Sequence, residues 1–122
     1  MGQNRIAAVS LDCAEPVPLA EFWASFVGGE LAFASAELAV VKLEHLLLTA
    51  MRVPGWVPPT WPGEGVGKQG HLDIAVDSMA DAQELALSLG ATRPDAQPAP
   101  ERHVVLLDPA GHPFCITSQL PT

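Results

Sequence analysis

The order of predicted elements repeats along the chain, and this repeat limits the possible folds more than any other feature. In the first half, alternating and helical hydrophobic patterns predict a strand, a helix and three strands, at about 5–12, 19–27, 30–34, 38–44 and 46–53. The second half repeats this order at about 71–76, 79–89, 91–93, 103–107 and 113–118. Neither half alone buries both faces of its strands, so we expect the two halves to pack together with a cleft between them.

Turn-forming residues place the boundaries of this repeat. Residues 15–18, with two prolines, are expected to separate the first strand from its helix, and Gly28-Gly29 to end that helix. A Pro/Gly-rich stretch separates the halves. We therefore predict a single domain over 1–122, with a first module at about 4–53, a connector at about 54–69 and a second module at about 70–119.

Charge excludes several classes of partner. The chain has 6 Lys+Arg against 14 Asp+Glu, a net charge of −8, and its cations are scattered singly. Nucleic acid and anionic membranes are therefore excluded as partners, whereas a cationic ligand would be attracted.

No run of about 18 apolar residues suggests a membrane span, and the start of the chain shows no secretory signal. We expect a cytoplasmic protein of bacterial type in which Cys13 and Cys115 are reduced.

Five short segments, in this order and spacing, carry a resemblance to a known family. They are Leu11-Asp12-Cys13-Ala14, the connector start at 53–59, Gly70-His71-Leu72-Asp73-Ile74-Ala75-Val76-Asp77, Leu89-Gly90-Ala91, and the stretch 106–115. The chain resembles the vicinal oxygen chelate superfamily, which includes glyoxalase I, extradiol dioxygenases and bleomycin resistance proteins, and within it the small glyoxalase-like group. The resemblance implies an α+β fold of two tandem βαβββ modules. These would form a curved, mixed, eight-stranded sheet around a central cup, with the helices outside.

The resemblance also implies where a metal would bind, and the residues there argue against one. The family's four ligand places fall on Ala8, a residue within 49–52, His71 and Cys115. Only His71 matches the family pattern. One imidazole and one thiol are too few protein ligands for a catalytic ion, which needs three or more. We therefore predict no metal and no cofactor.

The strand around His71 is the strongest candidate for function. Strand alternation puts His71 and Asp73 on one face and Leu72, Ile74 and Val76 on the other. Such an imidazole and carboxylate form an acid–base pair or bind a cationic ligand, or else Asp73 is a structural acceptor. By the same alternation we expect a pocket lined by the residues Ser10, Met51, His71, Asp73 and Cys115.

Two tryptophans, Trp56 and Trp61, lie in the connector, where proline stiffens the chain. One is expected to stack on a flat ligand at the mouth of the pocket, and the other to fill an apolar contact. The sequence does not say which. Trp23 has core spacing on the first helix.

Three functions follow, in order of preference. The first is sequestration of a small organic molecule, drug-like or a natural product and cationic or aromatic, without a metal. The second is a metal-independent lyase, isomerase or cyclase with His71 and Asp73 as catalytic acid and base. The third is a metal-dependent enzyme of the glyoxalase or dioxygenase type. Small two-module relatives generally form dimers, so we also expect a homodimer.

Overall fold

A computed structural model describes residues 5–68 and 70–119. The chain forms two compact units, Met1–Trp56 and Val57–Thr122, so the connector after Trp56 belongs to the second unit. The expected absence of a secretory signal concerns the start of the chain, and its first four residues lie outside the described residues. Position 69, at the end of the predicted connector, lies outside them as well. Neither helix in the described ranges has the length and apolarity to cross a membrane.

The first unit has the predicted strand–helix–three-strand order. Its elements are β1 (Ala8–Cys13), α1 (Pro16–Val27), β2 (Glu30–Ala34), β3 (Leu38–Lys42) and β4 (Leu47–Arg52). The four strands form one mixed sheet in the order β1-β4-β3-β2. β1 runs parallel to β4, and the other neighbours are antiparallel. Strand positions in this half agree with the sequence pattern to within a few residues.

The start of α1 differs from the prediction. Residues 15–18 were expected to break the chain before the helix, yet the helix begins at Pro16. The first helical positions have no intrahelical acceptor for their N–H groups, so a proline there loses nothing and its fixed φ favours the helix. At the other end Gly28 adopts φ 76° and donates its N–H to the Ala24 carbonyl, as the Gly28-Gly29 pair predicted.

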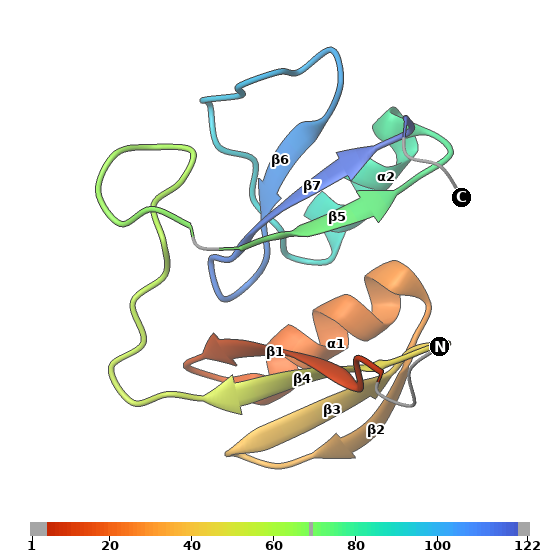
Figure 1. Ribbon diagram of the computed structural model, residues 1–122, viewed down its shortest axis with the longest axis vertical. Coiled ribbons are helices and arrows are strands. Elements are labelled where there is room, and N and C mark those ends of the chain that lie inside the picture. Colours follow the sequence, from red (N-terminus) through yellow and green to blue (C-terminus); the bar gives the residue numbers. More distant parts are fainter. Residues whose placement is uncertain (1–4, 69, 120–122) are drawn as a thin grey trace. The chain divides into compact units, whose positions relative to one another are not determined.

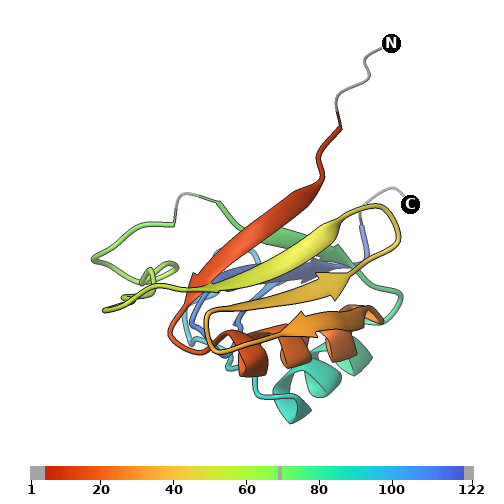
Figure 2. The same ribbon diagram turned by 90° about the horizontal axis from the view of Figure 1, so that it is seen from below.

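The core of the first unit lies between α1 and one face of its sheet (Figure 2). Leu19, Phe22 and Trp23 are buried, and Trp23 is only 1% exposed, as its spacing predicted. The rings of Phe22 and Trp23 meet edge to face with centroids 5.1 Å apart. Such pairs add to the hydrophobic effect of burial, so this face of α1 fixes the helix on the sheet.

The second unit repeats the topology with shorter elements. They are β5 (Leu72–Ala75), α2 (Met79–Ser88), β6 (Val104–Leu107) and β7 (Pro113–Thr117) (Figure 1). The sheet order is β5-β7-β6, with β5 parallel to β7 and β6 antiparallel to it. Ser78 caps α2 by accepting a hydrogen bond from the Asp81 N–H at 3.1 Å. The predicted α+β fold of two similar modules is thereby confirmed, although the second module has one strand fewer than the predicted βαβββ order.

The expected count of eight strands is wrong for the described residues, which contain seven. At the place of the missing strand, 91–93, only Thr92 pairs, in an isolated bridge with Leu107. Further along this edge of β6, the side chain of Gln97 makes the hydrogen bonds that a neighbouring strand would make. Its side-chain amide donates to the Val105 carbonyl at 3.0 Å and accepts from the Val105 N–H at 2.8 Å. The prolines that follow Thr92 (Pro94, Pro98 and Pro100) lack the N–H groups that a continuous strand needs.

Candidate functional site

His71 and Asp73 are in contact in the second unit. Asp73 lies in β5, and His71 directly precedes that strand. The alternation predicted from the sequence is present, because Leu72 and Ile74 are less exposed than His71 and Asp73. His71 Nε2 lies 3.1 Å from Asp73 Oδ1, and the two side chains are 26% and 51% exposed. The carboxylate therefore orients the imidazole while remaining open to solvent.

Cys115 completes a cluster with these two residues, which we call the His71–Asp73–Cys115 cluster. In the parallel pairing of β5 with β7, Cys115 is the direct partner of Asp73. The three potential ligand atoms all lie within 4.8 Å of one another. The cysteine is a free thiol and only 1% exposed. Burial raises the pKa of this thiol above its ordinary value of 9.0, the negative charge of Asp73 acts in the same direction, and the positive charge of Lys68 opposes both.

Trp61 is the connector tryptophan that meets the cluster. Its ring stacks on the His71 imidazole, with centroids 5.8 Å apart and planes inclined by 29°. The loop that carries it is closed by Thr60, whose N–H and hydroxyl both donate to the Val66 carbonyl, at 2.7 and 3.0 Å. Lys68 Nζ lies 4.3 Å from the centroid of the Trp61 ring, a cation–π contact. An aromatic ring that attracts a cation therefore lies beside an exposed carboxylate.

The remaining candidates belong to the first unit. Ser10 and Thr49 are partners in the parallel β1–β4 pairing, and their hydroxyls are 2.6 Å apart. Met51 lies two residues further along β4, on the same face, and is 44% exposed. The Trp56 N–H donates to the Val53 carbonyl at 3.1 Å. That Ser10, Met51 and Trp56 line a ligand pocket together with His71, Asp73 and Cys115 stays a prediction.

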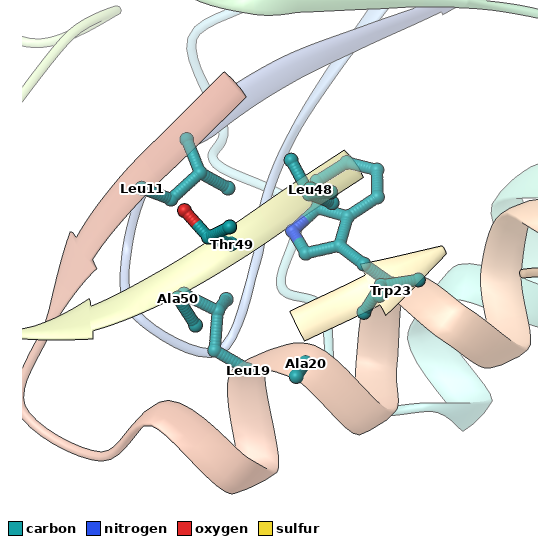
Figure 3. Close-up of a pocket in the computed structure, with 8 residues that line it drawn as sticks. Leu11, Leu19, Ala20, Trp23, Leu48, Thr49 and Ala50 are labelled. Carbon is teal, nitrogen blue, oxygen red and sulfur yellow. The ribbon is translucent and has the colours of Figure 1, made fainter. Parts of the chain in front are cut away.

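A crevice in the first unit is a packing feature and no binding site. It lies between α1 and the sheet, measures about 150 Å³ and leaves no space for a water-sized sphere. Leu19 and Trp23 from the helix face Leu11, Leu48 and Ala50 from the strands across it (Figure 3). Most of its walls are apolar core side chains, and the Thr49 hydroxyl and the Trp23 indole N–H are too few polar groups to define a specific ligand site.

The family's metal centre does not fit the residues of this chain. The pairing of Ser10 with Thr49 in β1–β4 is the counterpart of the pairing of Asp73 with Cys115 in β5–β7. Thr49 is thus the register equivalent of Cys115, and it offers a hydroxyl where the family pattern has a carboxylate. Ala8 offers no donor atom. The four-ligand centre implied by the resemblance therefore lacks both donors of the first module.

The count of candidate donors in the second module was nevertheless too low. The sequence-based count included His71 and Cys115 but left out Asp73. The β5–β7 register pairs Asp73 with Cys115, and the three potential ligand atoms lie within 4.8 Å of one another. The sequence contained part of this signal, because Asp73 shares a strand face with His71, but the pairing of the final strand with that strand comes from the structure. Lys68 was missed as well, and its place over Trp61 depends on the fold of a loop for which the sequence has no pattern.

One family model matches most of the chain, and solved structures of low sequence identity share its fold. The family described as "Glyoxalase-like domain" matches residues 8–117. A glyoxalase/bleomycin resistance protein/dioxygenase family enzyme from Burkholderia phytofirmans PsJN has a similar structure, with a TM-score of 0.70 and 17% identity over 93% of this chain and 97% of that one. The fosfomycin resistance protein FosX from Mesorhizobium loti gives 0.71 and 12%, over 98% and 94%. The bleomycin-binding protein from Streptomyces verticillus, in complex with copper(II)-bleomycin, gives 0.59 and 19%, over 98% and 100%. No curated protein has a significantly similar sequence.

Proposed function

This chain belongs to the family of glyoxalase-like domains, and we propose that it binds and sequesters a small organic molecule, cationic or aromatic, without the help of a metal. The observation that carries the proposal is the contact of Trp61 with His71 beside the half-exposed carboxylate of Asp73. An aromatic face and an open carboxylate are the groups that bind an organic cation. The net charge of −8 favours such a ligand over distance.

Lys68 supports this choice of ligand. Its ammonium group already lies over the Trp61 ring, so the ring is placed to accept a positive charge. A cationic ligand would take the place of Lys68 on the ring and find the Asp73 carboxylate close by. Two of the structural relatives named above are a bleomycin-binding protein and a fosfomycin resistance protein, and drug-like or natural-product ligands are therefore the first to try.

The test is a thermal-shift screen of cationic and aromatic natural products, followed by calorimetry on any ligand that raises the melting temperature. Asp73→Asn should weaken binding by about 1–3 kcal/mol, or roughly 5- to 150-fold, because a charged partner is lost. Added salt should weaken it as well. Asp77→Asn is the matched control, since Asp77 is an exposed carboxylate just beyond the other end of the same strand, four residues after Asp73. Equal affinity of the Asp73→Asn variant and the unaltered protein would contradict the proposal.

A second candidate function rests on the 3.1 Å contact between His71 and Asp73, which is the geometry of a general base with its orienting partner. Because Nε2 faces the carboxylate, Nδ1 is the nitrogen left to move a proton. In a metal-independent lyase, isomerase or cyclase, His71→Ala would abolish turnover and leave substrate binding largely intact. For a sequestering protein, no product forms from any bound ligand. The two candidates are thus separated by assaying each ligand for conversion.

We also propose that the protein is a homodimer. The edge strand β2 exposes Leu31 and Phe33, at 37% and 53%. An edge with exposed apolar side chains is prone to association. Light scattering should give about twice the chain mass of 12.8 kDa. A mass equal to that of one chain at micromolar concentration would contradict the proposal.

A further inference from the structure

The Trp61 ring already carries an ammonium group from its own loop. Lys68 Nζ lies 4.3 Å from the ring centroid, the place on an aromatic ring that attracts a cation most strongly. We propose that Lys68 is an internal competitor for the cation position on Trp61, so that its charge sets the affinity of the site. The inference rests on the proposed binding of an organic cation, and it adds a control of affinity that such binding does not itself require.

The cation–π contact is what holds the Lys68 side chain in place. Among residues 5–68 and 70–119, the ammonium group of Lys68 forms no ion pair, although the chain contains 14 Asp+Glu. Cation–π contacts are weak where solvent reaches them, and Lys68 is only half-buried. Its release also returns rotamer freedom to a long side chain. A ligand cation therefore displaces Lys68 at a small cost in free energy.

Little of the ring remains for a ligand while Lys68 is in place. Trp61 is half-buried, and its ring also stacks on the His71 imidazole with centroids 5.8 Å apart. The charge of Lys68 also reaches the site: the pKa of Cys115 is raised by burial and by Asp73, and Lys68 acts against both. Since Cys115 is the direct strand partner of Asp73, Lys68 both covers the ring and repels a cation that approaches the carboxylate.

The loop allows Lys68 to leave the ring while Trp61 stays on His71. The hydrogen bonds that close the loop join Thr60 to the Val66 carbonyl, so they do not involve Lys68. Residues 63–67 are exposed, and a Cβ built on Gly67 would meet no atom within 4 Å. The ammonium group can thus move into water. The apparent affinity for a ligand cation is then reduced by the fraction of molecules in which Lys68 covers the ring.

The test compares lysine variants of the full chain by calorimetry, with benzyltrimethylammonium as the probe. This quaternary cation suits an aromatic face and also carries a ring. Lys68→Gln should bind it more tightly by about 2- to 5-fold, the factor that a solvent-exposed cation–π contact is worth. Lys42→Gln is the matched control, because it removes the same single charge from an exposed residue at the end of β3 and should leave the affinity nearly unchanged. Lys68→Arg keeps a cation for the ring and should resemble the unaltered protein.

A second measurement needs no substitution. With a trace of acetic anhydride, Lys68 should be acetylated more slowly than Lys42, because its amine is shielded by the Trp61 ring. Saturation with the probe should speed the labelling of Lys68 and leave that of Lys42 unchanged. Mass spectrometry of peptides measures both rates.

The results separate a failure of this inference from a failure of the proposed function. If the unaltered protein binds the probe and Lys68→Gln binds it equally or more weakly, Lys68 is not a competitor, and the cation site stands. Labelling of Lys68 as fast as Lys42 without the probe would also overturn the inference. If no variant binds the probe, the cation site itself is refuted, and the inference with it. Circular dichroism should establish that each variant folds.

Discussion

We predict that the side-chain amide of Gln97 contributes strongly to the stability of the second unit. It makes three hydrogen bonds to the backbone: Nε2 donates to the carbonyls of Pro94 and Val105 at 2.9 and 3.0 Å, and Oε1 accepts from the Val105 N–H at 2.8 Å. Val105 itself is fully buried, at 0% exposure. In Gln97→Ala the N–H and carbonyl of Val105 lose the partners that a strand would otherwise have supplied.

The size of the effect follows from these contacts. A net hydrogen bond contributes about 0.5–1.5 kcal/mol, and a buried backbone group left without a partner costs about 1–3 kcal/mol. Gln97 is only half-buried, so water reaches part of the vacated space and reduces the loss. We expect Gln97→Ala to lower the free energy of unfolding by about 3 kcal/mol, a large part of the stability of an ordinary domain.

Urea unfolding measures the total loss, and hydrogen exchange of the Val105 amide locates it. Gln83→Ala is the matched control. Gln83 accepts one hydrogen bond, from Arg93 Nε at 3.0 Å, on the exposed surface, and its loss should cost less than about 0.5 kcal/mol. If Gln97→Ala stays within 0.5 kcal/mol of the unaltered protein, or if the Val105 amide keeps its protection, Gln97 does not replace the missing strand.

Three further predictions concern single positions in the second unit. Ser78→Ala should cost about 1 kcal/mol in urea unfolding, because α2 loses its N-cap. Gly111→Ala should cost about 1–3 kcal/mol in the same assay, since Gly111 has φ 90° and a Cβ there would lie 2.7 Å from Pro58 Cβ. The raised pKa of Cys115 means that the native state holds this proton more tightly. Its contribution to stability is therefore present below pH 9.0 and lost as pH rises through the native pKa. Melting temperatures from neutral pH to about pH 10 should fall more steeply for the unaltered protein than for Cys115→Ala.

The repeat of elements was readable from the sequence because hydrophobic periodicity records which face of each element is buried. The errors arose where other chemistry replaces a regular pattern. Pro16 was taken as a break, although a proline costs nothing in the first turn of a helix. The one strand that is missing from the described residues was predicted near Thr92. The prolines that follow Thr92 prevent a continuous strand, so β6 is paired on this side only by the Thr92 bridge and by the side chain of Gln97. Secondary-structure propensities do not predict that one side chain supplies the hydrogen bonds of a neighbouring strand.

The candidate site was recovered in part for a similar reason. Strand alternation predicts that His71 and Asp73 share a face, and the structure brings them into contact. Pairing between β5 and β7 decides that Cys115 joins them, and register is a tertiary property that single-strand patterns do not contain. Trp61 could not be chosen over Trp56 from composition, because the hydrogen bonds of Thr60 that shape its loop leave no periodic signal.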